Sequence, residues 1–175
     1  MGLFGRILNA IFSVALTLIF SVLVVYFIPR WIIDSDFHLF PLQIGGFRFI
    51  GLAPIILGIV TMVGFIWGWT LSGTGTPLQF DLPKELIVRG SYRYTRNPMY
   101  VGYFLILFGE SILFQSSALL LYLLVSFLFF HTVVVLLEEP MLKLKFGESY
   151  EQYCRSVPRW VPRLKPFRGD ISKYS

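Results

Sequence analysis

The chain has 175 residues, of which 55% are hydrophobic and only 14% charged, with a mean hydropathy of +0.69 and a formal net charge of +5. Soluble domains contain about 25% charged residues, so this chain lacks the polar side chains to face water on all sides. These values exclude a disordered chain and a soluble nucleic-acid binder. They predict an all-α integral membrane protein.

The first two apolar stretches, residues 7–28 and 49–71, are each long enough to cross a bilayer as a helix. No small-residue cleavage site follows the first stretch, so we expect a retained span that stops at Pro29-Arg30-Trp31 rather than a signal peptide. The second stretch places Gly64 and Gly68 on one helix face, and such pairs allow close helix–helix contact in lipid.

Residues 99–114 and 118–137 form the third and fourth predicted spans, giving about four transmembrane helices in total. Only Gln115-Ser116-Ser117 separates them, which predicts a helical hairpin. The third span carries Glu110, and a carboxylate at membrane depth is expected to face the bundle interior or a polar cavity. A structural hydrogen bond and a functional role for Glu110 are both open.

Lysine and arginine are distributed unevenly between the connecting segments. The segment between spans one and two contains only Arg30 and Arg48, at its borders, whereas the next segment contains four cationic residues and the C-terminal tail eight. Because cytoplasmic loops are enriched in Lys and Arg, this distribution predicts a multi-pass protein with both termini in the cytoplasm.

Residues 138–175 are predicted to form an amphipathic cytoplasmic cap, within a single membrane domain covering 1–175. Five apolar or aromatic residues recur there at three- and four-residue steps and indicate an interfacial segment: Phe146, Tyr150, Tyr153, Val157 and Trp160. The prolines at 158, 162 and 166 then predict an extended end that lies along the surface.

Two polar groups are predicted to meet at the cytoplasmic end of the hairpin. One is the segment before span three, where Arg93 and Arg96 precede Pro98 at a helix N-terminus, a setting that suits a carboxylate or phosphate. The other is the Glu138-Glu139 pair at the end of span four. The arginines could instead serve only as topology anchors, and the acids could simply pair with Arg93 or Arg96.

The sequence lacks the residue sets that a metal site, a nucleophilic hydrolase or a phosphate-binding loop would require. Cys154 is the only cysteine, and His38 and His131 share no ligand spacing, so we expect no metal site. No serine or cysteine is placed with a histidine and an acid, and no phosphate-binding loop is present.

Several motifs resemble those of membrane methyltransferases. Residues 93–102 (RYTRNPMYVG) are similar to the R-H-P-x-Y-x-G motif of the isoprenylcysteine carboxyl methyltransferases and phospholipid N-methyltransferases. Glu138-Glu139, residues 146–153 (FGESYEQY) and Val157-Pro158 resemble the E-E…F-G-x-x-Y-x-x-Y…V-P ending of these families, in the same order. The resemblance covers about residues 83–163.

This resemblance implies an S-adenosylmethionine (SAM) site between the last two spans and the tail, which would fold over the cofactor as a lid. The implied cofactor-binding residues are Arg96, Asn97, Pro98, Met99, Tyr100, Leu105, Glu138 and Glu139. The cofactor carboxylate would suit the arginines, and its amine and ribose hydroxyls would suit the acids. Glu110 and Glu138 are the candidates for a catalytic base, which an amine acceptor would require and a carboxylate or thiolate would not.

Two positions differ from the family pattern. Asn97 stands where the family has histidine, and residues 132–137 lack the arginine that helps to hold the substrate carboxylate in the carboxyl methyltransferases. The leading hypothesis is therefore a methyltransferase of a lipidic or small apolar acceptor that enters from the membrane lipids, with the acceptor group and the oligomeric state left open. The alternatives are a small four-helix transporter or channel using Glu110, and a non-catalytic membrane scaffold of the same fold.

Overall fold

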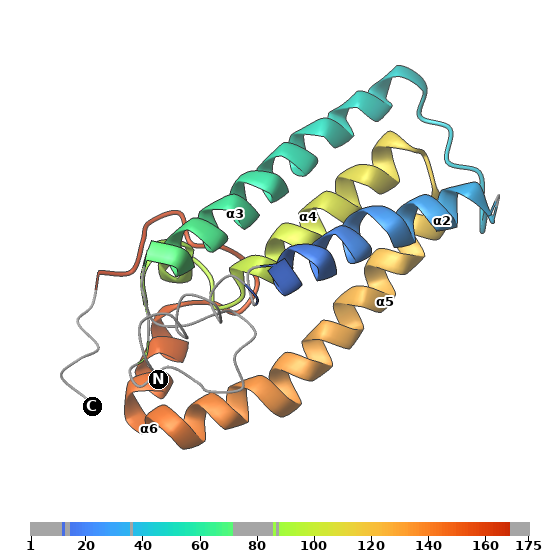
Figure 1. Cartoon of the computed structure of the whole chain (residues 1–175). Helices are drawn as coiled ribbons and strands as arrows, with labels where there is room; N and C mark the ends of the chain where they lie inside the picture. Colours follow the sequence, from blue (N-terminus) through green and yellow to red (C-terminus); the bar gives the residue numbers. More distant parts are fainter. Residues whose placement is uncertain (1–11, 13–14, 36, 72–85, 87, 169–175) are drawn as a thin grey trace.

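The computed structural model describes residues 12, 15–35, 37–71, 86 and 88–168, and the ordered elements among them are helices. Three helices are long and apolar enough to cross a membrane, Ala15–Asp34, Gly45–Gly68 and Ser117–Ser156, and the shorter apolar helix Pro98–Leu113 lies between the last two in sequence. The all-α integral membrane fold expected from the composition is confirmed. The helices lie alongside one another in one bundle (Figure 1).

The first helix does not stop at Pro29-Arg30-Trp31 as expected. A π-helical turn, η1 (Leu23–Phe27), leads directly into α2 (Ile28–Asp34), so the helix continues past the proline. Proline lacks the amide hydrogen and clashes with the carbonyl four residues earlier, and the wider turn before it removes both conflicts. The Ser21 hydroxyl hydrogen-bonds to that of Tyr103 at 2.8 Å, which joins this helix to the next-but-one span.

A 3₁₀ turn, η2 (Gly45–Gly51), precedes α3 (Leu52–Leu71), which packs antiparallel to α4 (Pro98–Leu113). The close contact is made by Gly58 against Gly102 and by Gly51 against Gly109: a Cβ on Gly58 would lie 2.7 Å from the Gly102 carbonyl oxygen. The expected contact at Gly64 and Gly68 is not a helix–helix contact. Those two glycines face Ser91 and Gly90 at the loop before α4, because the small residues that interleave depend on where the helices cross.

The α4–α5 hairpin has the expected short turn, since α5 runs from Ser117 to Val133. Its polar side chains are all used by nearby backbone amides. Ser117 Oγ accepts from the amides of Leu39 and Phe40 at 3.0 and 3.2 Å, and Gln115 Oε1 accepts from the Ile44 amide at 2.8 Å. The connection between the first helix and α3 is therefore fastened to the hairpin turn.

The helix of the fourth predicted span continues beyond Leu137. A second π turn, η4 (Val134–Glu138), is followed by α6 (Glu139–Ser156), and Pro140 lies two residues beyond the turn, as Pro29 does after η1. A kink at Gly147, whose φ is +52°, divides α6. Beyond α6, residues 157–168 form an extended segment, as the prolines predicted, and we call this segment the strap.

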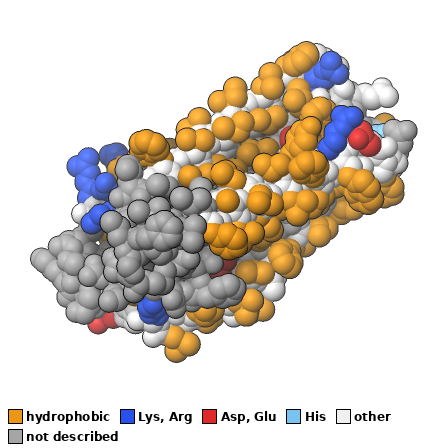
Figure 2. Space-filling view, viewed as in Figure 1, with side chains coloured by type: hydrophobic (Ala, Val, Ile, Leu, Met, Phe, Trp, Pro, Cys, Tyr) orange, Lys and Arg blue, Asp and Glu red, His pale blue; other side chains and the backbone are white. Residues whose placement is uncertain are grey.

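The stripe of Tyr150, Tyr153 and Val157 is not the interfacial surface that the spacing indicated. These side chains are only 1–3% exposed and form a core cluster inside the protein, together with Leu86, Val88 and other partly buried residues. A periodic apolar face shows which residues point the same way, but it does not show whether lipid or protein meets them. Apolar side chains along the rest of the bundle surface remain exposed, with cationic side chains near its ends (Figure 2).

Candidate active site

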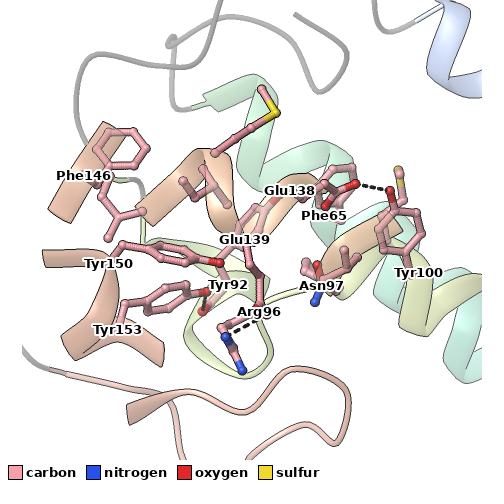
Figure 3. Close-up of a pocket in the computed structure, with 16 residues that line it drawn as sticks. Phe65, Tyr92, Arg96, Asn97, Tyr100, Glu138, Glu139, Phe146, Tyr150 and Tyr153 are labelled. Atoms are coloured by element: carbon pink, nitrogen blue, oxygen red, sulfur yellow. Dashed lines mark hydrogen bonds and ion pairs between the residues drawn. The ribbon is translucent and has the colours of Figure 1, made fainter. Parts of the chain in front are cut away.

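A cavity of about 300 Å³ lies at the end of the bundle where α4 begins and α5 passes into α6 (Figure 3). Its walls come from α3, the 3₁₀ turn η3 (Gly90–Arg93), the start of α4, and the η4–α6 junction. Pro98 is the first residue of α4, where its missing amide hydrogen is not needed. The cavity volume is at the lower end of the range of about 300 to 1,000 Å³ usual for small-molecule sites.

Most of the predicted site residues line this cavity. The structure brings together Arg96, Asn97, Pro98, Met99, Tyr100, Glu138 and Glu139. Leu105 and Glu110 are not among its lining residues. Glu110 lies twelve residues beyond Pro98 along α4, a helical rise of about 18 Å toward the hairpin turn.

Glu139 is the centre of a buried ion cluster. It is 7% exposed, and it accepts hydrogen bonds from Arg96 Nη1 at 2.9 Å and from Arg159 Nε and Nη2 at 2.7 and 2.9 Å. The hydrogen bond to Glu139 is the main reason that the pKa of Arg159 lies above its ordinary value. The two guanidinium groups compensate the cost of burying this carboxylate.

Arg96 is not fully used by this cluster. Its Nη1 also donates to Cys154 Sγ at 2.8 Å, while its Nε is buried without a hydrogen-bond partner among the described residues. Buried donors without partners are rare in folded proteins and call for an explanation. Arg96 also lines the cavity, so its guanidinium belongs to the site with one donor unused.

Glu138 has a different neighbour from Glu139. The Tyr100 hydroxyl donates a hydrogen bond of 2.6 Å to Glu138 Oε1, which Figure 3 shows at the edge of the cavity. Burial, followed by the negative charge of Glu138, raises the pKa of Tyr92 on the opposite wall. Glu138 therefore provides a carboxylate beside aromatic rings, held by a hydroxyl rather than by a guanidinium.

Asn97 holds the strap. Its Nδ2 donates to the Arg159 carbonyl at 3.2 Å, and the Thr95 hydroxyl donates to the same oxygen at 2.9 Å. Backbone hydrogen bonds from Arg96 to Pro158, from Arg163 to Tyr94 and from Phe167 to Arg93 continue this pairing. The loop before α4 and the strap thus lie side by side, and the strap holds the loop that carries the lining residues Arg96 and Asn97.

Trp160 fastens the strap to the helices. Its indole Nε1 donates to His131 Nδ1 at 3.1 Å, and its ring lies 5.6 Å from both Phe104 and Phe127. Tyr100 stacks on Phe130 with ring centroids 4.7 Å apart. An aromatic group between α4 and α5 therefore adjoins the cavity behind Tyr100.

Sequence reasoning missed Arg159, Tyr92 and the inward tyrosines of α6. Arg159 was counted only among the tail cations, and nothing in its spacing distinguished it from Arg155 or Arg163. The signal for Tyr150 and Tyr153 was present in their periodicity but was assigned to the membrane surface. Tyr153 in fact donates a hydrogen bond of 2.8 Å to the Tyr92 carbonyl and so supports the cavity wall.

The side chains of the cavity are chemically suited to the groups of SAM, the cofactor that the resemblance implies. A carboxylate suits the Arg96 guanidinium, an amine or hydroxyl suits Glu138, and an aromatic base or a sulfonium suits the rings of Tyr92, Tyr100 and Phe65. Glu139 is already occupied by two arginines, so it supports Arg96 rather than contributing a free carboxylate.

Comparison with known proteins shows the affiliation of the chain. Residues 47–149 match the family model described as phospholipid methyltransferase. The protein-S-isoprenylcysteine O-methyltransferase of Schizosaccharomyces pombe is 40% identical over 80 residues, which cover 45% of this chain and 34% of that protein. The methanethiol S-methyltransferase of Crocosphaera subtropica is 37% identical over 87 residues, 50% of this chain and 31% of that protein. The chain thus spans about a third of the length of these two relatives.

A solved structure shares the fold. The eukaryotic intramembrane Ras methyltransferase ICMT (isoprenylcysteine carboxyl methyltransferase) superposes with a TM-score of 0.54 at 23% identity, covering 88% of this chain and 53% of that one. At this identity the likeness concerns the fold alone. It places the helices of this chain in an architecture already known from the membrane.

Proposed function

The chain belongs to the phospholipid methyltransferase family, and from this membership we propose that it is a SAM-dependent methyltransferase of a lipidic or small apolar acceptor. The observation that carries the proposal is the cavity at the start of α4. There Arg96, whose guanidinium keeps one buried donor unused among the described residues, and Glu138 line one space among aromatic side chains. SAM, when bound, supplies a methyl group on a positively charged sulfur.

The residues of the chain then have separate tasks. Arg96 would hold an anionic group, with Glu139 and Arg159 fixing the direction of its guanidinium. Tyr92 and Tyr100 would flank the cofactor, and the strap would hold the loop that carries Arg96 and Asn97. Holding two reactants in line can supply about 7 to 11 kcal/mol of the rate acceleration, so orientation by these residues is the main contribution required.

Glu138 is the candidate for proton transfer. Its carboxylate lines the cavity and already accepts one hydrogen bond from Tyr100, so it could take a proton from an amine acceptor. A carboxylate or thiolate acceptor would not need this step. Glu110 is too far along α4 to act on the same atoms, and we drop it from this role.

The acceptor would come from the lipid side of the hairpin. The walls toward α4 and α5 are aromatic and aliphatic, and the outer faces of these helices are exposed apolar surfaces such as Phe108, Leu124 and Leu128. A lipidic or small apolar acceptor can partition into this region from the bilayer. Both relatives above carry methyltransferase names, but their acceptors differ, so the acceptor group of this chain is left to experiment.

The transporter alternative rests on Glu110, whose Oε2 is buried without a partner among the described residues. An ion path from Glu110 toward the cavity would need polar groups along α4. The residues between Tyr100 and Glu110 contribute only the Tyr103 hydroxyl, which is bonded to Ser21. The observations therefore favour the methyltransferase.

The test is binding followed by transfer. We expect SAM to raise the melting temperature of the detergent-purified protein, because a ligand that binds only the folded state stabilises it by mass action. ATP, which shares the adenosine moiety but lacks the sulfonium, is the control. Transfer of a radiolabelled methyl group to extracted membrane lipids would then identify the acceptor. A protein that is equally stable with and without saturating SAM would contradict the proposal.

We further propose that the cavity faces the cytoplasm, with both termini on that side, because the cationic residues gather there. Single cysteines introduced at Ser35 and at Arg168 should react with an impermeant thiol reagent from opposite sides of sealed vesicles. Both residues are exposed. Labelling of both from the same side would contradict this orientation.

A further inference from the structure

The cap exposes several large apolar side chains next to its charged ones. Leu164 is 100% exposed and Leu144 is 89% exposed, while Val161 and Met141 are also more than half exposed. The apolar stripe that the sequence suggested for lipid is buried inside the protein instead. The cap thus presents a second, different set of apolar residues to its surroundings.

In α6 these residues belong to the half before the kink. Leu137, Met141 and Leu144 follow one another at steps of four and three residues, so they continue one exposed face of α5 into α6. After Gly147 the exposed residues are Glu148, Glu151 and Arg155, a charged surface suited to water. The exposed large apolar residues of α6 therefore lie before the kink, together with Lys143 and Lys145, whereas the exposed side chains after it are all charged.

The strap packs against α4 and α5 through Trp160. Trp160 contacts Phe104, six residues or a rise of about 9 Å inside α4, and also reaches His131 on α5. Tryptophan favours the boundary between lipid headgroups and acyl chains. Val161 and Leu164 follow directly, so their exposed side chains leave the protein surface close to this boundary.

The charge of the strap identifies the kind of lipid. Residues 157–168 contain Arg159, Arg163, Lys165 and Arg168 and no acidic residue, and α6 adds the exposed Lys143 and Lys145. Arg159 is used by Glu139 and Arg163 donates to the Ser156 carbonyl, whereas Lys165 and Arg168 project as exposed side chains. Cationic residues beside exposed apolar ones are the pattern of a surface that binds an anionic leaflet.

We propose that the strap, with the first half of α6, docks on an anionic lipid leaflet, inserting Val161 and Leu164 at the boundary and pairing Lys165 and Arg168 with lipid phosphates. We call residues 161–168 the docking segment. Because Arg159 of the strap hydrogen-bonds to Asn97, Thr95 and Glu139, lipid bound to this segment would also steady the side chains that line the cavity. The leaflet charge would then affect how rigidly Arg96, Asn97 and Glu139 are held.

The experiment places an environment-sensitive fluorophore on single cysteines in a Cys154→Ser background of the full chain, without cofactor. Leu164→Cys reports on the docking segment, and Glu148→Cys, beyond the kink, is the matched control. Both are reconstituted in nanodiscs of phosphatidylcholine alone or mixed with phosphatidylglycerol, each with a shallow doxyl-labelled lipid as quencher. Val161→Cys serves as a second reporter should the first variant fold poorly.

We expect at least about twofold stronger quenching at position 164 than at 148, and a further increase with phosphatidylglycerol. Replacing Lys165 and Arg168 by glutamine should remove about half of that increase, since each cation near an anionic surface contributes to the attraction. Equal quenching at 164 and 148 would overturn the docking segment, including the case in which a second copy of the chain covers it. Strong quenching at 164 that is indifferent to phosphatidylglycerol and to the two glutamines would overturn the requirement for anionic lipid. Neither result depends on methyl transfer.

Discussion

The two ends of the α4–α5 hairpin use polar residues in opposite ways. At the turn, Ser116 caps α5 and Ser117 and Gln115 accept hydrogen bonds from backbone amides. At the other end, Arg96, Glu138 and Glu139 are gathered around a cavity, and Arg96 Nε lacks a partner. A polar cluster in which every donor and acceptor is paired within the protein supports the fold. A cluster that keeps a buried donor without a partner is suited to a ligand.

The largest effect should come from Glu139→Gln, because it leaves the largely buried Arg96 and the partly buried Arg159 without their counter-charge. Breaking a buried ion pair by removing one partner costs about 3 to 5 kcal/mol of the free energy of unfolding. Thermal or denaturant unfolding in detergent measures it, with Glu148→Gln on the exposed face of α6 as the control. Equal stability of the two variants would show that the cluster is not a structural centre.

Glu138→Gln should act on binding rather than on stability. Hydrogen bonds to charged groups contribute about 1.5 to 3 kcal/mol, so the dissociation constant of SAM should rise at least about tenfold. The neutral amide keeps the size of the side chain and can still accept from Tyr100, so the unfolding free energy should change little. Calorimetric titration compares it with Glu148→Gln, and matching affinities would remove Glu138 from the site.

Ser117→Ala tests the turn end of the α4–α5 hairpin. It would remove the acceptor of the Leu39 and Phe40 amides, and because both residues are exposed we expect only the net value of a hydrogen bond to be lost, about 0.5 to 1.5 kcal/mol each. We expect a lower melting temperature with unchanged SAM affinity. A loss of SAM affinity without a loss of stability would show that the turn end, and not only the cavity end, serves ligand binding.

The smallest effect is expected for Asn97→Ala. The Arg159 carbonyl would keep the Thr95 hydroxyl as a donor, so only one hydrogen bond is lost. The free energy that holds the strap against the loop should fall by about 0.5 to 1.5 kcal/mol. Asn97→His should be tolerated, since an imidazole nitrogen can donate to the same oxygen. Limited proteolysis of the strap with and without SAM measures the effect, and a large affinity loss in Asn97→Ala would instead indicate direct contact with the cofactor.

The membrane class, the hairpin and the location of the site were predictable because each depends on nearby residues. Only three residues separate spans three and four, so Asn97-Pro98 and Glu138-Glu139 had to lie at the same end whatever the rest of the bundle does. The π turns before Pro29 and Pro140 were not predictable in this way. A proline in the sequence indicates that a helix ends or kinks there. Whether the helix instead continues through a π turn depends on how the rest of the chain packs.

The sequence by itself determined that this is a helical membrane protein of the phospholipid methyltransferase family, with arginines and paired acids at one end of a hairpin. The tertiary structure decided which acid is neutralised, since Arg159 reaches Glu139 from twenty residues away and leaves Glu138 to Tyr100. It also decided that Tyr150 and Tyr153 face the protein while Leu144 and Leu164 face outward. The physical reason is that periodicity defines a face of a helix, but the long-range packing of other segments decides what that face meets.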